Sequence, residues 1–244
     1  MKCCNAYESD DMKNITGETL RPGGFTLTDK AVKFCKLSSK DSIMDLGCGT
    51  GATLNYLCEK YNISAVGLDP SQKLINKGKK IYKNLKFICG KGEKIPFHNA
   101  EFNGVFAECT LSLMENLNNV IGDVFRILKP GGWFIITDVY ARKTEFIHEL
   151  HEISVNSCMR GIHNLDELKN TVKNIGFHVE LLEDCSDMLK ELMVKTIFTY
   201  GSMSIFWNKV SSCSIDGCEF QQLLKKCKPG YFIMIAKKED ECYE

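Results

Sequence analysis

Three glycines at alternate positions follow a carboxylate in the stretch that runs from Asp45 through Gly47 and Gly49 to Gly51. Because glycine has no side chain, such a stretch turns tightly and brings its backbone N–H groups close to a ligand. A helix predicted to begin near Ala52 adds a partial positive charge at its N-terminus. The combination is suited to binding a nucleotide-like cofactor that carries a carboxylate or a phosphate.

The spacing of the glycines separates two classes of cofactor. Dinucleotide-binding enzymes use Gly-x-Gly-x-x-Gly, in which the third glycine comes one position later than it does in this chain. The run Asp-x-Gly-x-Gly-x-Gly instead resembles the first motif of the class I S-adenosylmethionine-dependent methyltransferases. The resemblance implies that Asp45 and the glycine turn, with Cys48 and Thr50 between the glycines, bind the methionine end of that cofactor.

Four further segments follow in the order and spacing of the same family, so that the resemblance covers roughly residues 40–140. The segment 65–71 is predicted to be a strand ending in Asp69, where a carboxylate accepts the two ribose hydroxyls of a nucleotide. The other segments match the family's adenine-side loop, fourth strand and Lys-Pro-Gly-Gly turn, and they are 90–97, 102–108 and 127–136. Within the family the chain is most similar to the small-molecule (type 11) group typified by ubiquinone and menaquinone biosynthesis methyltransferases.

Two cations near the predicted cofactor site have competing interpretations. Lys91 stands where the related group has an acidic residue, and a charged lysine cannot accept a hydrogen bond from the adenine amino group. Adenine recognition then rests on the backbone of Gly92 and the side chain of Glu93, unless Lys91 simply points into water. Arg21 either binds the cofactor's carboxylate or is a surface arginine before a Pro-Gly turn. The predicted cofactor-binding residues are Arg21, Asp45, Gly47, Cys48, Gly49, Thr50, Gly51, Asp69, Pro70, Lys91, Gly92, Glu93 and Glu108.

Two predicted catalytic residues, Glu108 and Tyr140, lie just past the fourth and fifth predicted strands, where an acceptor should approach. Either side chain could act as the base for a hydroxyl or amine acceptor, whereas a thiolate or carbanion acceptor would need no base. Glu108 could equally hold the cofactor. Since a sulfonium methyl group is already activated, we expect the main contribution of the protein to be alignment of acceptor, methyl and sulfur.

The chain contains 13 cysteines, and two interpretations of them remain open. In a reducing compartment they stay free thiols that pack as small hydrophobic groups, as expected for Cys35, Cys58 and Cys89. Alternatively, some of them hold a thiophilic acceptor such as trivalent arsenic, because soft centres prefer thiolate ligands. The candidates for that role are Cys48, Cys109, Cys158 and Cys185. We predict no metal cofactor, since no Cys-x-x-Cys pair is present.

Composition narrows the range of partners. The 244 residues include 31 lysines and arginines and 31 aspartates and glutamates, so the net charge is zero, whereas proteins that bind a nucleic-acid backbone usually carry a basic excess. The sequence has no apolar run of the roughly 18 residues needed to span a bilayer, and its N-terminus lacks the apolar core of a signal peptide. We therefore predict a cytoplasmic protein with a small-molecule substrate, no nucleic-acid partner and no membrane contact.

The predicted elements alternate between strand and helix, which favours a parallel sheet whose strand ends share one edge. Strands are expected at 42–46, 63–68, 85–89, 102–107, 132–138, 177–183 and 231–237, and helices at 52–60, 71–82, 115–128 and 165–175. Together with the resemblance, this pattern implies an α/β Rossmann-like doubly wound sheet of seven strands, six parallel and the last antiparallel. A helical insert, with apolar residues at helical spacing over 184–230, precedes the last strand.

We expect one methyltransferase domain over 1–244. Its parts are an N-terminal cap (1–37), a cofactor-binding core (40–140), a substrate-side region with the helical insert (141–230), and the last strand and tail (231–244). Thr28 is the predicted N-cap of a helix in the cap region. The insert either extends the core or forms a substrate lid or the surface of a homodimer. A domain that binds the cofactor as a sensor or scaffold, without catalysis, is the alternative function.

Overall fold

A seven-stranded sheet forms the centre of the molecule in the computed structural model, which describes residues 6–211 and 216–239. Its strand order is β3-β2-β1-β4-β5-β7-β6, and the last strand in sequence, β7, runs antiparallel to both of its neighbours. The strands are β1 (Ser42–Leu46), β2 (Ser64–Asp69), β3 (Lys86–Cys89), β4 (Phe102–Glu108), β5 (Leu128–Ala141), β6 (Phe177–Asp184) and β7 (Pro229–Lys238). The predicted Rossmann-like architecture is therefore confirmed.

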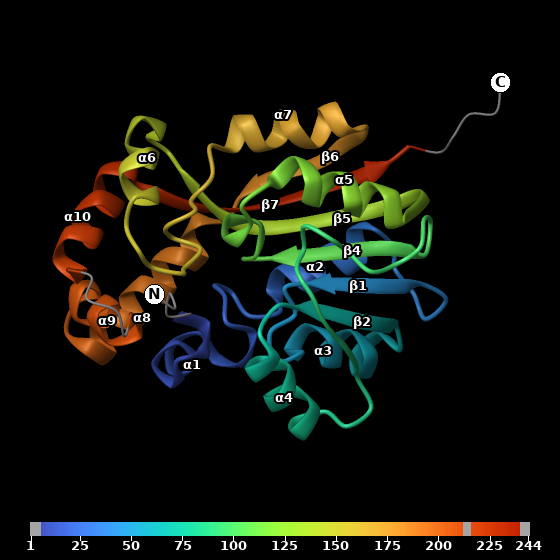
Figure 1. The fold of residues 1–244 in the computed structure, drawn as a ribbon, viewed down its shortest axis with the longest axis horizontal. Helices are drawn as coiled ribbons and strands as arrows, with labels where there is room; N and C mark the ends of the chain where they lie inside the picture. The colour runs from blue at the N-terminus through green and yellow to red at the C-terminus, as the bar shows by residue number, and fades with distance from the viewer. Residues whose placement is uncertain (1–5, 212–215, 240–244) are drawn as a thin grey trace.

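Helices cover both faces of this sheet, as Figure 1 shows. They are α1 (Asp10–Thr16), α2 (Thr26–Phe34), α3 (Ala52–Tyr61), α4 (Gln72–Ile81), α5 (Leu117–Ile127), α6 (Ile147–His151), α7 (Leu165–Ile175), α8 (Ser186–Tyr200), α9 (Met203–Val210) and α10 (Gly217–Cys227). Successive residues of a strand point to opposite faces. Accordingly Ile135 packs into the core beneath α2 and α3, whereas Phe134 and Ile136 pack into the core beneath α5 and α7.

The predicted helical insert is also confirmed, since α8, α9 and α10 all lie between β6 and β7 in sequence. In Figure 1 these helices gather at one end of the sheet together with α1 and α6. Trp207 of α9 is buried and donates a 2.9 Å hydrogen bond to Gln221 of α10, which joins two helices of the insert. On the outer side of α8, Phe198 is 87% exposed.

Some local predictions were wrong. Residues 6–25 include α1 and two short 3₁₀ turns, although the sequence pattern indicated no helix before Thr28. Thr28 is not an N-cap, because α2 already begins at Thr26, and the buried hydroxyl of Thr28 is used in a tertiary contact instead. Cys89 is exposed rather than packed in a core. Among the described residues, no helix is long and apolar enough to cross a bilayer.

Candidate active site

The glycine turn between β1 and α3 has the backbone conformation that the sequence predicted. Gly47, Gly49 and Gly51 have φ values of 76°, 54° and 86°, a region that residues with side chains rarely adopt. A Cβ atom at Gly47 would collide with the hydroxyl of Thr110, and one at Gly51 would lie 2.5 Å from the ring of Phe87. At Gly49 the nearest atom would be 3.7 Å away, so this glycine borders open space. Packing fixes two of the glycines, and the third leaves room for a ligand.

Two buried carboxyl groups lie beside this turn. Asp69, at the end of β2, accepts 2.8 Å hydrogen bonds from the backbone N–H groups of Gly49 and Ser71. Burial raises the pKa of Asp69 above its usual value. Asp45, only 3% exposed, has its pKa raised to about 8 by burial and by the nearby charge of Glu108. Carboxyl groups at the ends of two neighbouring strands thus face the same space.

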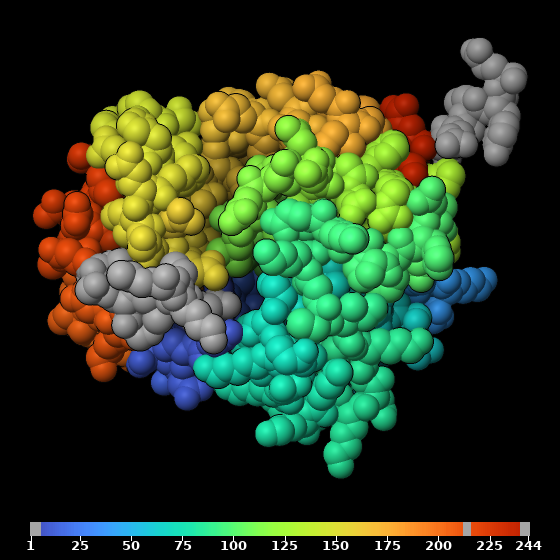
Figure 2. All heavy atoms as spheres, in the orientation of Figure 1, coloured from blue at the N-terminus to red at the C-terminus, as the bar shows by residue number. Residues whose placement is uncertain are grey.

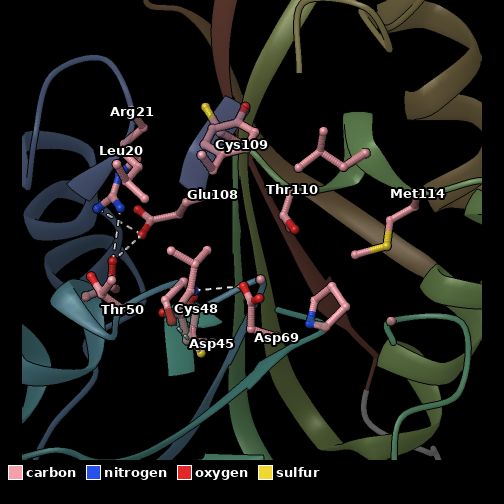
Figure 3. A pocket seen from close by; sticks show the side chains of 18 of the residues that line it. Leu20, Arg21, Asp45, Cys48, Thr50, Asp69, Glu108, Cys109, Thr110 and Met114 are labelled. Atoms are coloured by element: carbon pink, nitrogen blue, oxygen red, sulfur yellow. Dashed lines mark hydrogen bonds and ion pairs between the residues drawn. The ribbon is translucent and has the colours of Figure 1, made fainter. Parts of the chain in front are cut away.

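A buried ion pair closes one side of that space. Arg21 lies 2.9 Å from Glu108, and the two side chains are 4% and 2% exposed. The hydroxyls of Thr28 and Thr53 donate hydrogen bonds of 2.9 and 3.0 Å to the two oxygens of Glu108. Figure 3 shows Arg21 and Glu108 pointing toward one another at the edge of the pocket. The segment that precedes α2 is thereby joined to the end of β4.

Arg21, Asp45, Thr53, Asp69 and Glu108 all line a pocket of about 320 Å³. The face in Figure 2 is hollowed between the green segment near residue 110 and the yellow segment near residue 155. Of the 13 predicted cofactor-binding residues, all but Gly51 line the pocket. The lining residues outside that predicted set include Tyr7, Leu20, Leu74, Thr110, Met114 and Asn156. The last of these lies outside every motif, so only the folded chain could place it there.

Tyr140 lies away from this pocket. Its hydroxyl donates a 3.1 Å hydrogen bond to Asp184, which lies at the end of β6. The structure therefore does not bring the two predicted catalytic residues together. The nearby carboxylate of Asp138, also in β5, makes internal contacts. It accepts hydrogen bonds of 2.7 and 3.0 Å from the hydroxyl and N–H of Ser112 and lies 3.4 Å from His163.

Two of the four candidate cysteines meet at the edge of the pocket. The thiols of Cys109, which follows β4, and Cys158 are hydrogen bonded. That bond and burial raise the pKa of Cys109 well above its usual value. The backbone N–H of Cys158 donates to the hydroxyl of Tyr7 at 3.1 Å, and the thiol of Cys109 lies 3.6 Å from the hydroxyl of Tyr231.

The other two candidate cysteines lie elsewhere. Cys48 is buried within the glycine turn, where its sulfur packs against the backbone of Gly67, and burial raises the pKa of its thiol well above the usual value. Cys185 is the N-cap residue just before α8, and its thiol lies 3.9 Å from the carbonyl oxygen of Glu183. Within the described residues, no group of three or more His, Cys, Asp or Glu side chains is arranged to hold a metal ion.

The fold and the glycine-turn pocket define a Rossmann-like α/β protein with a nucleotide-type site at the carboxyl ends of its strands. A family model described as a methyltransferase domain matches residues 37–191, more than half of the chain. The chain therefore belongs to the class I S-adenosylmethionine-dependent methyltransferases. Its finer likeness to ubiquinone and menaquinone enzymes stays a prediction.

Individual relatives are distant. The chain is 26% identical to the 24-methylenesterol C-methyltransferase 2 of Oryza sativa subsp. japonica over 149 residues, which are 56% of this chain and 41% of that protein. It thus spans about two fifths of the length of that relative. The structure of the [4+2]-cyclase SpnF has a TM-score of 0.74 at 18% identity, with 96% of this chain and 93% of that chain covered.

A second solved structure has a similar fold and contains the product of the cofactor. The phosphoethanolamine N-methyltransferase 2 of Haemonchus contortus was solved with phosphomonomethylethanolamine and S-adenosylhomocysteine. Its TM-score is 0.74 at 16% identity, and the match covers 95% of this chain and 57% of that chain.

Proposed function

We propose that this protein binds S-adenosylmethionine in the 320 Å³ pocket and transfers its methyl group to a small-molecule acceptor. When bound, the cofactor supplies a methyl group activated by the positive sulfonium. The observation that carries the proposal is the shared lining of one pocket by the glycine turn, Asp69 and the buried carboxyl of Asp45. Backbone N–H groups suit a carboxylate, and carboxylates suit hydroxyl and ammonium groups.

The acidic groups of the pocket lining support S-adenosylmethionine as the cofactor. Asp45, Asp69 and Glu108 contribute three acidic groups to the pocket, and of these Glu108 is paired with Arg21. An acidic excess favours a cofactor that carries a sulfonium and an ammonium over one that carries phosphates. We propose that the remaining contacts come from the predicted set. These are the turn residues with Cys48 and Thr50, then Pro70, and on the adenine side Lys91, Gly92 and Glu93.

We propose further that neither predicted catalytic residue acts as a base. Both oxygens of Glu108 accept hydrogen bonds, and the carboxylate is paired with Arg21. Glu108 therefore stabilises the wall of the pocket. Tyr140 lies outside the pocket lining. The contribution of the chain is then alignment of the acceptor with the methyl group.

Calorimetry with S-adenosylhomocysteine and, separately, NAD tests cofactor choice. We expect heat with the first ligand and none with the second, and the reverse result would refute the proposal. Incubation with S-adenosylmethionine and a metabolite extract should then release S-adenosylhomocysteine. Binding without release across broad extracts would favour the sensor or scaffold instead.

The proposed function also includes a domain organisation, a cellular location and an oligomeric state. We propose one domain over 1–244 with the four parts predicted above, a cytoplasmic location and no nucleic-acid partner. The exposed Val194, Ile197 and Phe198 on α8 support a homodimer through the insert. Analytical ultracentrifugation measures the oligomeric state of the wild type and of Phe198→Glu. We expect a dimer for the wild type and a monomer for the variant.

Trivalent arsenic is a second candidate acceptor, because the thiols of Cys109 and Cys158 meet beside the pocket. Two thiolates are suitable ligands for such a soft centre. Methylation of arsenite in the presence of a thiol reductant should then be lost in Cys109→Ser and Cys158→Ser. Unchanged activity in both variants, or no methylated arsenic from the wild type, would exclude arsenite.

A further inference from the structure

A second cavity, of about 50 Å³, adjoins the cofactor pocket, and we name it the apolar chamber. Tyr7, Leu20, Arg21 and Cys109 line both spaces, so the two spaces share a wall beside the paired thiols. The side chains that enclose the chamber come mainly from α1, α8 and α9, and they include Met12, Leu189, Leu192, Met203, Phe206 and Trp207. Helix α1 and helix α9 lie outside residues 37–191, the range that the family model matches.

The chemistry of the chamber lining is restrictive. Among its described lining residues there is no histidine, lysine or carboxylate, and the single charged group is Arg21, which is already paired with Glu108. An ammonium acceptor would find no base to remove its proton and no anion to offset its charge. The lining therefore favours an acceptor that is apolar and uncharged when it binds.

A larger and more polar hollow, of about 720 Å³, also borders the cofactor pocket. It shares Leu113, Met114, Glu115 and Asn156 with that pocket. In Figure 3, Met114 lies across the pocket from Arg21 and Glu108. Because the resemblance implies that the methionine end of the cofactor binds on the Asp45 side of the pocket, the apolar chamber would lie nearer to the methyl group than the larger hollow does.

We propose that the apolar chamber holds the acceptor and that the acceptor is a short-chain alkyl thiol, an inference that rests on the proposed methyltransferase function. An alkyl thiol is uncharged at neutral pH, so it enters an apolar space without burying a charge, and the thiolate that it forms is nucleophilic enough to react without a general base. The chamber has about a third of the volume of a 150 Å³ apolar cavity that holds benzene, which limits the alkyl chain inside it to about two carbons. Flexible methionines such as Met12 and Met203 adapt to such a guest.

In the proposed reaction, the thiol binds uncharged and gives up its proton to water beside the cofactor, where the sulfonium offsets the negative charge of the thiolate. The thiolate sulfur forms a bond to the methyl carbon while the bond between that carbon and the sulfonium breaks. The electron pair of the broken bond stays on the cofactor sulfur. The products are an alkyl methyl thioether and S-adenosylhomocysteine, and no oxidant or reductant is needed.

The test uses ethanethiol, butanethiol and hexanethiol with the full-length protein. Calorimetry in the presence of saturating S-adenosylhomocysteine measures binding without reaction, and mass spectrometry measures the thioether formed from S-adenosylmethionine. Leu192→Ala enlarges the chamber, and Leu192→Phe fills it. Leu117→Ala makes the matched change in the larger hollow, where Leu117 is part of the lining.

We expect the wild type to bind and methylate the shorter thiols. Leu192→Ala should raise the ratio of hexanethiol to ethanethiol turnover by about tenfold, the usual effect of one methylene of space, and Leu192→Phe should abolish thiol binding. Leu117→Ala should leave the ratio unchanged. Affinity for S-adenosylhomocysteine should be equal in all three variants, which confirms that they are folded.

Three results would overturn the inference. If the protein binds the cofactor and methylates compounds in an extract but no alkyl thiol, the substrate class is wrong while the proposed function stands. Methylation of arsenite but of no thiol would likewise exclude alkyl thiols and would favour arsenite as the acceptor. A chain-length preference that follows Leu117→Ala instead of Leu192→Ala places the acceptor in the larger hollow. If the cofactor itself does not bind, the proposed function fails first.

Discussion

At the scale of single residues, the carboxylate of Asp69 has two functions. It holds the N–H groups of Gly49 and Ser71 at 2.8 Å and, in the proposed complex, accepts the ribose hydroxyls. Charge-assisted hydrogen bonds of this kind contribute about 1.5–3 kcal/mol each. Asp69→Ala should therefore weaken S-adenosylhomocysteine binding at least about tenfold by calorimetry, a change of about 1.4 kcal/mol. Asp69→Asn, which keeps one acceptor oxygen, should lose less, and wild-type affinity in both variants would place the cofactor elsewhere.

Asp45 makes cofactor binding depend on pH. Because burial and Glu108 raise its pKa to about 8, this carboxyl is mostly protonated in the free protein below that pH. Arg21 and Asp69 also face it. An ammonium group bound beside it favours the carboxylate, so binding releases the proton and affinity must increase with pH.

Between about pH 6 and about pH 7.5, affinity for S-adenosylhomocysteine should rise by up to tenfold per pH unit, as expected when one proton is released. Calorimetry in two buffers of different ionisation enthalpy measures that proton directly. Asp45→Asn cannot ionise and should bind weakly at every pH in this range. A flat profile in the wild type would mean that Asp45 is already ionised when the pocket is empty.

At the scale of elements, the turn between β1 and α3 depends on Gly49. A valine there would have to adopt a φ of 54°, at a cost of about 1–3 kcal/mol, and its methyl groups would enter the open space of the pocket. Gly49→Val should therefore weaken cofactor binding more than Asp69→Ala does. Gly122→Val, at a helix position with open space around the Cβ, is the matched control and should bind normally. Equal affinities would show that the turn does not contact the cofactor.

Helix α2 and strand β4 are joined through one hydroxyl. Thr28→Val keeps the shape of the side chain but leaves Glu108 without one of its donors, and an unsatisfied buried acceptor costs about 1–3 kcal/mol. Urea unfolding should show a loss of stability of that size. Thr26→Val, at an exposed position of the same helix, should change stability by less than about 0.5 kcal/mol. A loss as large in Thr26→Val would assign the effect to the helix and not to the contact.

At the scale of the whole molecule, ligand binding should stabilise the fold, because the pocket is assembled from segments spread between Tyr7 and Asn156 and is lost on unfolding. At a ligand concentration of 100 Kd the gain is ~2.7 kcal/mol, which for a chain of this size raises Tm by about 5–10 °C. Differential scanning calorimetry with S-adenosylhomocysteine should show this increase, and NAD should give none. A Tm that does not respond to S-adenosylhomocysteine would contradict the proposed site.

The sequence by itself determined the architecture of this protein and the glycine-turn side of its site. Strand and helix periodicity is local, and a turn with φ values above 50° at three alternate positions strongly favours glycine at each of them. For that reason β1 matches its predicted bounds, and β2 and β4 differ from theirs by a residue or two. The motif residues Asp45 and Asp69 line the pocket because the ends of parallel strands share one edge.

Only the tertiary structure decided what surrounds that turn. Thr28 and Glu108 are 80 residues apart, and Tyr7 and Cys158 are 151 apart, so no local pattern relates them. Their contacts depend on how the segment before α2 packs against the ends of β4 and β5. The same packing turned Tyr140 away from the pocket and paired Arg21 with Glu108. Periodicity reports which face of an element is buried, whereas the partner of a buried polar group is set by the three-dimensional packing of distant segments.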